Sequence, residues 1–163
     1  KHEFKFIDKK GNVREIISNF SKLPDSDELL LSMIDITGRK EMEERLRKSE
    51  EKYRTIFEST GTAMAITRKD TVIELVNKEF ERLFGYSKDE IEGKKSWTEF
   101  IVDEDLSKME EYHQNRRKDP DSVPDRYESR VIDKGGKKRR MLFTVSMIPD
   151  TDKSLVSMID VGE

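Results

Sequence analysis

Residues 7–36 of the chain read IDKKGNVREIISNFSKLPDSDELLLSMIDI, and residues 132–161 read IDKGGKKRRMLFTVSMIPDTDKSLVSMIDV. The two stretches align without a gap at an offset of 125 residues, and 14 of their 30 positions are identical. Unrelated chains of ordinary composition would share only about 2 of these positions. A repeat at this spacing predicts two copies of one domain-sized module rather than a solenoid of short repeats. We expect residues 1–36 to be only the last part of the first copy.

Both copies show the same order of strands and turns. The adjacent Gly135 and Gly136 can supply the positive φ that a tight hairpin requires, and Pro149-Asp150 is typical of a second turn. The expected strands of the second copy cover 127–132, 141–148 and 155–161. Those of the first copy cover 4–8, 13–20 and 29–36. The sequence therefore predicts an antiparallel three-stranded meander in each copy.

A strongly charged stretch between the two copies predicts a long helix from about Gly38 to Ser59, with Thr37 as its N-cap. Acidic and basic residues follow one another at the favourable i, i+4 spacing, as in Glu41 and Arg45. Apolar residues alternate at spacings of four and three, which is typical of a coiled-coil seam. The expected helix-pairing residues are Met42, Leu46, Tyr53 and Ile56. The alternative is a single amphipathic helix that lies on its own domain.

The segment between this helix and the second copy predicts a hairpin and several helices. The expected strands cover 62–67 and 72–76. The expected helix starts are Asn77, Ser87 with Glu90 in a capping box, and Asp103. Two strands, then helices, then three antiparallel strands predict an α+β fold.

The composition narrows the function. Hydrophobic residues make up 33% of the chain and charged residues 41%, with both signs interspersed and a net charge of −3. We therefore expect neither nucleic-acid binding nor direct membrane contact. The absence of cysteine excludes disulfides, thiolate nucleophiles and a cysteinyl-flavin adduct. It is compatible with the cytoplasmic location that we expect.

The sequence resembles the PAS/PAC sensory-box domain of bacterial and archaeal signal-transduction proteins. The resemblance covers nearly the whole chain, because 49–161 match one full module and 1–37 match the last three strands of another. The residues that carry it are Asn77-x-x-Phe80-x-x-Leu83-Phe84-Gly85-Tyr86-Ser87, Glu90-Ile91, Arg126-Tyr127-Glu128 before a Lys-Gly-Gly turn, and Ser157-Met158-Ile159-Asp160.

This resemblance implies a five-stranded antiparallel sheet with short helices on one face, preceded by a long helix and three strands of a previous PAS domain. The expected domains are 1–37 for those three strands, 38–59 for a connecting signalling helix, and 60–163 for the complete PAS domain. The implied function is a sensory input or relay module of a multidomain, multi-PAS sensor histidine kinase in a two-component system. The alternative is a ligand-free PAS domain that serves for dimerisation and spacing.

The resemblance also implies a small cavity that could hold an unknown small ligand. The candidate lining residues are Met64, Ile66, Phe80, Phe84, Ile91, Trp97, Met109, Tyr127, Phe143 and Val145. The alternative is that these side chains simply fill the core. We do not expect haem, because polar neighbours around His113 favour a surface position for the only histidine on the relevant helix.

A signal relay is implied at the strand–helix junction. Asp35-Ile36-Thr37 resembles the motif that passes a signal from the last strand into a connecting helix, and we expect Asp35 to pair with Arg39. The second copy offers Asp160 but has Gly162 in place of the threonine.

No residue set in the sequence supports catalysis or metal binding, so we do not expect an enzyme. The expected partners are a second copy of the chain and neighbouring PAS and kinase domains of a parent protein. Because residues 1–36 carry many apolar side chains, we expect them to pack against another protomer or against the sheet of the complete module.

Overall fold

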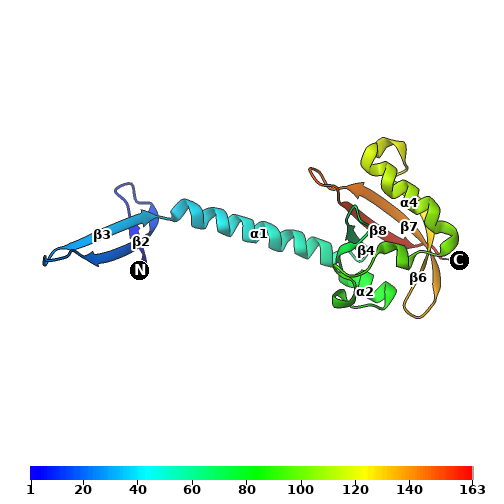
Figure 1. Cartoon of the computed structure of the whole chain (residues 1–163), viewed down its shortest axis with the longest axis horizontal. Coiled ribbons are helices and arrows are strands. Elements are labelled where there is room, and N and C mark those ends of the chain that lie inside the picture. Colours follow the sequence, from blue (N-terminus) through cyan, green and yellow to red (C-terminus); the bar gives the residue numbers. More distant parts are fainter. Residues whose placement is uncertain (163) are drawn as a thin grey trace. The chain divides into compact units, whose positions relative to one another are not determined.

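The computed structural model describes residues 1–162, which fall into two compact units, one from Lys1 to Arg54 and one from Thr55 onward. In the first unit, three antiparallel strands form a sheet in the order β1-β2-β3 (Figure 1). Their bounds are His2–Ile7 for β1, Val13–Lys22 for β2 and Leu29–Asp35 for β3. Helix α1 (Thr37–Ser59) follows, and none of its residues is buried.

The second unit contains a five-stranded antiparallel sheet in the order β5-β4-β8-β7-β6. Its strands are β4 (Ala63–Thr67), β5 (Ile73–Val76), β6 (Arg126–Ile132), β7 (Lys138–Met147) and β8 (Ser154–Asp160). The helices between β5 and β6 are α2 (Lys78–Phe84), α3 (Lys88–Ile91), η1 (Trp97–Phe100), α4 (Asp103–Lys118) and η2 (Pro120–Ser122). Helix α4 packs against one face of this sheet through Met109 (Figure 1). The predicted α+β fold is confirmed.

The repeated stretches form the same ladders in both units. Every strand pairing of β1, β2 and β3 recurs in β6, β7 and β8 at the offset of 125 residues. Equivalent pairs are Ile16–Asp35 and Met141–Asp160 in one ladder, and His2–Ser18 and Tyr127–Phe143 in the other. The second turn also agrees, because Asp25 (φ 57°) and Asp150 (φ 60°) both adopt the left-handed conformation. The repeat in the sequence is therefore a repeat in structure.

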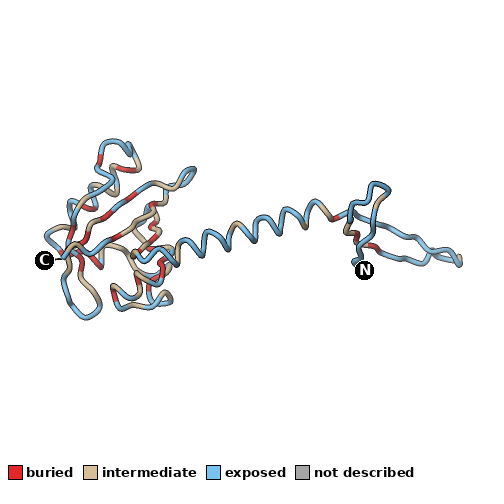
Figure 2. Tube along the Cα trace, turned by 180° about the vertical axis from the view of Figure 1, so that it is seen from behind, coloured by how far each residue is buried: buried red, intermediate tan, exposed pale blue. Residues whose placement is uncertain are grey.

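The two copies differ in how far their apolar face is buried. Phe6 is 41% exposed, whereas the equivalent Val131 is fully buried. Figure 2 shows buried residues concentrated in the second unit, where the sheet and helices enclose the core. The apolar side chains of residues 1–36 remain largely exposed, and their packing against a further surface stays a prediction.

Two predicted N-caps are wrong. Thr37 is the first residue of α1, and its hydroxyl oxygen accepts a hydrogen bond from the Glu15 backbone N–H on β2 at 2.8 Å. Asp103 is the first residue of α4, and the N-cap Val102 makes no side-chain bond. In this first turn of α4 the acidic side chains can act through the helix dipole rather than as a cap.

The other predicted helix starts are confirmed. Asn77 caps α2, and Ser87 with Glu90 forms a complete capping box on α3. A second capping box, between Ser96 and Glu99, starts η1. The same Ser-x-x-Glu spacing is visible in the sequence and could have predicted η1. Among the described residues, no helix combines the length and the apolar character needed to span a bilayer.

Candidate functional site

A small cavity lies within the core of the second unit, between the sheet and its helices, with a volume of about 60 Å³. Its wall is mostly apolar, but it includes several polar side chains. The lining residues are Ala65, Thr67, Ile73, Phe80, Phe84, Trp97, Phe100, Ile101, Met109, His113, Arg116, Tyr127, Val131, Phe143, Val145, Ser154, Val156 and Met158.

Aromatic rings pack against one another along the cavity wall. The ring of Phe100 meets that of Phe84 edge to face at a centroid distance of 5.1 Å. On the sheet side, Tyr127 and Phe143 stack at 5.7 Å with nearly parallel planes. These geometries are favourable for aromatic pairs and fix the side chains that border the cavity.

Helix α4 presents one face to the cavity, and this face carries both apolar and polar side chains. Met109, His113 and Arg116 recur at spacings of four and three, so they lie on the same side of the helix. The Arg116 side chain is 2% exposed, and its guanidinium donates to Asp125 Oδ1 at 3.1 Å and to the Pro124 carbonyl at 2.7 Å. A buried guanidinium beside an apolar cavity is the most unusual feature of this site.

The structure places His113 on the cavity wall, so the expected surface position is wrong. Its Nε2 lies 3.0 Å from the Lys69 carbonyl oxygen, and its Nδ1 lies 3.1 Å from Arg117 Nη1. Burial lowers the pKa of His113, and the charge of Arg117 acts in the same direction. A neutral imidazole that donates from Nε2 and accepts at Nδ1 fits both contacts. Since both ring nitrogens are engaged, His113 is not placed to ligate a haem iron.

Two further polar groups face this environment. Burial raises the pKa of Tyr127 to about 12, so its hydroxyl stays protonated at neutral pH. The indole Nε1 of Trp97 is buried and has no hydrogen-bond partner among residues 1–162. Such an unpaired donor is uncommon in a folded core.

Most of the candidate lining residues border the cavity, namely Phe80, Phe84, Trp97, Met109, Tyr127, Phe143 and Val145. Ile91 is buried in the core but away from the cavity, and Met64 and Ile66 lie on the opposite face of β4. The prediction assigned the larger apolar residues of β4 to the inside. Alternation instead buries the small Ala63 and Ala65, which leaves room for the cavity.

At the strand–helix junction of the first unit, Asp35 does not pair with Arg39 as expected. Its Oδ1 accepts a hydrogen bond from the Thr37 backbone N–H at 2.9 Å, and its Oδ2 lies 3.9 Å from Arg14 Nη1. Hydrogen bonds from Thr37 lower the pKa of Asp35. Arg39 is instead paired along the helix with Glu43 at 2.9 Å. The motif therefore connects α1 to strand β2 rather than to its own next turn.

Asp160 has a closely similar environment in the second unit. Its Oδ2 lies 3.6 Å from Arg139 Nη1, and its Oδ1 accepts from the Gly162 backbone N–H at 2.9 Å. Gly162 replaces the threonine of the first copy, so the hydroxyl contact to the neighbouring strand has no equivalent.

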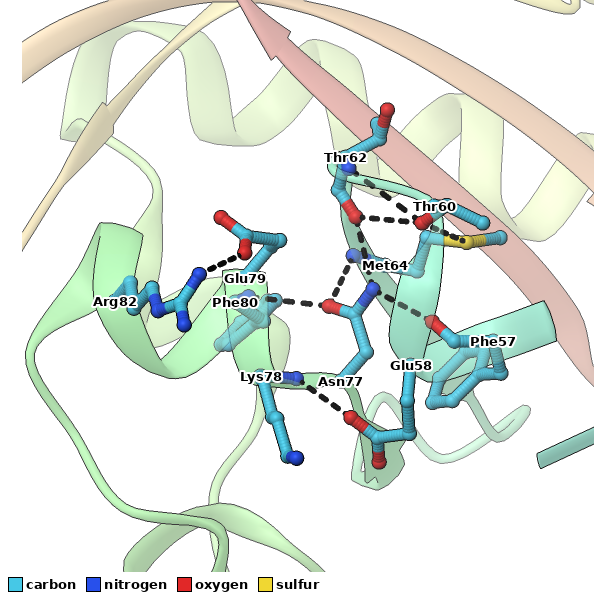
Figure 3. A network of polar contacts seen from close by, with 10 residues as sticks. All are labelled: Phe57, Glu58, Thr60, Thr62, Met64, Asn77, Lys78, Glu79, Phe80 and Arg82. Carbon is cyan, nitrogen blue, oxygen red and sulfur yellow. Dashed lines mark hydrogen bonds and ion pairs between the residues drawn. The ribbon is translucent and has the colours of Figure 1, made fainter. Parts of the chain in front are cut away.

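A second junction was missed by the sequence analysis, although its central residue was recognised as a cap. Asn77 is fully buried, and its side chain makes four hydrogen bonds (Figure 3). Its amide nitrogen donates to the carbonyls of Phe57 and Thr62 at 2.9 and 2.8 Å. Its oxygen accepts from the N–H groups of Met64 and Phe80 at 2.9 and 3.1 Å. One amide thus joins the last turn of α1, strand β4 and the start of α2.

Glu58 strengthens the same junction. Its Oε2 accepts from the Lys78 backbone N–H at 3.0 Å (Figure 3), and Oε1 is paired with the Lys88 ammonium. Both partners begin helices, since Lys78 opens α2 and Lys88 opens α3. The end of α1 is therefore bound directly to α3 and to α2, and α2 borders the cavity through Phe80 and Phe84.

The expected helix-pairing residues of α1 are all exposed. They are Met42, Leu46, Tyr53 and Ile56.

A sequence profile of the PAS domain family matches residues 61–163. The chain therefore belongs to the PAS domain family. A comparison with curated protein sequences gave no significant match.

Solved structures share the fold. A PAS domain of an HTR-like protein from Haloarcula marismortui matches 75% of this chain and 99% of its own, at 20% identity and a TM-score of 0.57. A domain of a sensory box sensor histidine kinase/response regulator from Geobacter sulfurreducens matches 71% of this chain and 96% of its own, at 22% identity and a TM-score of 0.57. A PAS domain in complex with ethanol, from a LuxR-family transcriptional regulator of Burkholderia thailandensis, matches 67% of this chain and 96% of its own, at 16% identity and a TM-score of 0.54.

Proposed function

We propose that the chain is a sensory input and relay module of a multidomain signal-transduction protein whose output is a histidine kinase. The cavity would sense a small molecule, and helix α1 would carry the change. Two similarities support this proposal: one solved relative comes from a sensor histidine kinase, and another holds ethanol.

The observation that carries the proposal is the position of Asn77 between the cavity and the helix. Phe80, whose backbone N–H donates to Asn77, also lines the cavity with its ring. Phe57, whose carbonyl accepts from Asn77, lies in the last turn of α1. A shift of α2 caused by ligand binding would therefore reach α1 through one buried amide. Because coupling is reciprocal, a change in α1 would also alter ligand affinity.

A cavity-filling variant tests this relay without knowledge of the ligand. Ala65→Val adds two methyl groups to the cavity wall. We expect it to shift the NMR amide signals of Phe57 and Glu58 as well as those of residues that line the cavity. In an Asn77→Ala background the change should stay within the cavity wall. Shifts confined to the cavity wall in the chain with intact Asn77 would contradict the relay.

A second function, dimerisation and spacing, is favoured by the exposed apolar seam of α1. Met42, Leu46, Tyr53 and Ile56 recur at heptad-like spacing, so two copies of the same helix can pair through them. We expect Leu46→Lys to convert a dimer to a monomer in analytical ultracentrifugation, whereas Lys48→Gln on the same helix should leave the dimer intact. An unchanged sedimentation coefficient for Leu46→Lys would contradict helix pairing.

A further inference from the structure

The cavity of the second unit carries a positive charge that is poorly compensated. The side chain of Arg116 is 2% exposed, and its carboxylate partner is Asp125, which is 78% exposed. A guanidinium has five N–H donors, and the Asp125 and Pro124 oxygens each accept from one of its two terminal nitrogens, while the neutral Tyr127 hydroxyl also interacts with it. Because most of the Asp125 carboxylate is in water, it offsets the cost of burying the cation only in part. Arg116 is therefore suited to a second anionic partner.

Trp97 adds a second donor to the same cavity. It lines the cavity from η1, and its buried Nε1 meets no acceptor among residues 1–162. His113 packs against the Trp97 ring at a centroid distance of 5.3 Å. Since both nitrogens of His113 already have partners, the imidazole supports the wall and leaves Trp97 Nε1 free. A bound group that accepts hydrogen bonds would satisfy this indole.

The remaining wall is mostly apolar, with the buried Thr67 and Ser154 among its hydroxyl-bearing residues, and the space is small. Phe80, Phe84 and Met158 border the cavity, and its volume is about 60 Å³. A dry protein cavity that holds benzene measures about 150 Å³. The occupant must therefore be smaller than a benzene ring, with an apolar part and an acceptor end.

We propose that this cavity binds a short aliphatic monocarboxylate of roughly two or three carbons, whose carboxylate meets Arg116 and Trp97 while its alkyl part lies among the phenylalanines. The proposal rests on the sensory function proposed above and names its ligand class. A planar carboxylate matches the fork of a guanidinium, which makes arginine a better anchor than a single ammonium. The ligand also competes with Asp125 for Arg116, so binding would loosen the segment 119–125 that leads into β6.

Isothermal titration of the full chain with sodium propionate at constant ionic strength tests the proposal, with 1-propanol as the neutral analogue and benzoate as the oversized one. We expect saturable binding of propionate and at least about tenfold weaker binding of 1-propanol. Benzoate should not bind. Equal affinities for propionate and 1-propanol, no saturable propionate binding, or tighter binding of benzoate would each overturn the assignment.

Matched variants distinguish a loss of carboxylate binding from a loss of folding. Trp97→Phe should weaken propionate about tenfold and 1-propanol by less, because the lost Nε1 donor bonds a charged carboxylate more strongly than a neutral hydroxyl. Asp125→Asn should tighten propionate, because the competing charge on Arg116 is removed. Arg116→Gln should abolish propionate binding, with Arg82→Gln as the exposed control of equal charge change. If Asp125→Asn and Trp97→Phe both remain folded and leave the propionate affinity unchanged, the carboxylate site is refuted.

The outcome is separable from that of the sensory proposal. If 1-propanol binds as well as propionate and shifts the amides of Phe57 and Glu58, the ligand class is wrong while the sensory relay stands. If propionate binds but those amides do not shift, the ligand class stands and the relay through Asn77 fails.

Discussion

The meander of β1, β2 and β3 and the meander of β6, β7 and β8 share every pairing register, yet only the second has a covered apolar face. In the second unit the helices between β5 and β6 cover the positions that stay open in the first. The difference shows that short-range sequence specifies strands, turns and register, whereas burial depends on the elements that pack on the sheet.

The similarity extends to ion pairs. In each copy one arginine lies between two aspartates at equivalent positions. The contacts are Arg14 with Asp8 (3.2 Å) and Asp35 (3.9 Å), and Arg139 with Asp133 (3.6 Å) and Asp160 (3.6 Å). The pairs of the first copy include the more exposed Arg14 (41%), whereas Arg139 and Asp133 of the second copy are only 27% and 14% exposed. Pairs that solvent still reaches contribute little energy, so we assign them to the geometry of the last strand rather than to its stability.

The largest expected effect comes from a charge placed at one equivalent position in each copy. Val131→Asp buries a carboxylate in a fully enclosed site and should lower the free energy of unfolding of the second unit by about 4 kcal/mol. Phe6→Asp should change the same transition by less than about 0.5 kcal/mol. Urea unfolding followed by the fluorescence of Trp97, the single tryptophan, measures both. Equal decreases in the free energy of unfolding for the two variants would contradict the difference in burial between the two copies.

A smaller loss of stability is expected at the junction around Asn77, which joins α1, β4 and α2 and has no counterpart in residues 1–36. Asn77→Ala leaves buried amide and carbonyl groups without partners and should cost about 3 kcal/mol in the same assay. Asn19→Ala, on an exposed position of β2, is the matched control and should cost less than about 0.5 kcal/mol. If both variants unfold at the same urea concentration, Asn77 does not hold the unit together.

The smallest effect concerns pH. The pKa of His113 is lowered by burial, so the unfolded chain binds a proton more readily than the folded one. Lys69 contributes a carbonyl contact, while Arg116, Arg117 and Asp70 are the charged neighbours. The free energy of unfolding should therefore fall as pH decreases from about 7.5 to 5.5, and His113→Gln should flatten this slope. Identical slopes for the two proteins would show that His113 is not the titrating group.

The repeat predicted much of the fold, because the turn residues and the alternation of β6 to β8 act locally. The caps at Asn77 and Ser87 were predicted for the same reason. The inward face of β4 was not predicted correctly, because an alternation of period two does not tell which face of a strand meets the core. Ala65 rather than Met64 borders the cavity.

The polar end of the candidate site was also beyond sequence reasoning. Arg116 belongs to a run of charged residues at the end of α4, where basic side chains usually face solvent and favour the helix dipole. Its burial depends on Pro124 and Asp125 folding back across the helix, which is a tertiary contact. The bond from Asn77 to Phe57 was missed because it spans 20 residues and two elements.

The central claim is that the two copies share one strand plan and differ in stability because only the second is covered. Hydrogen exchange of the central strands tests it directly, since residues 16–20 of β2 and 141–145 of β7 have equivalent pairings. We predict that amides of β7 exchange at least about a thousandfold more slowly than their equivalents in β2. Similar protection in the two strands would contradict the account.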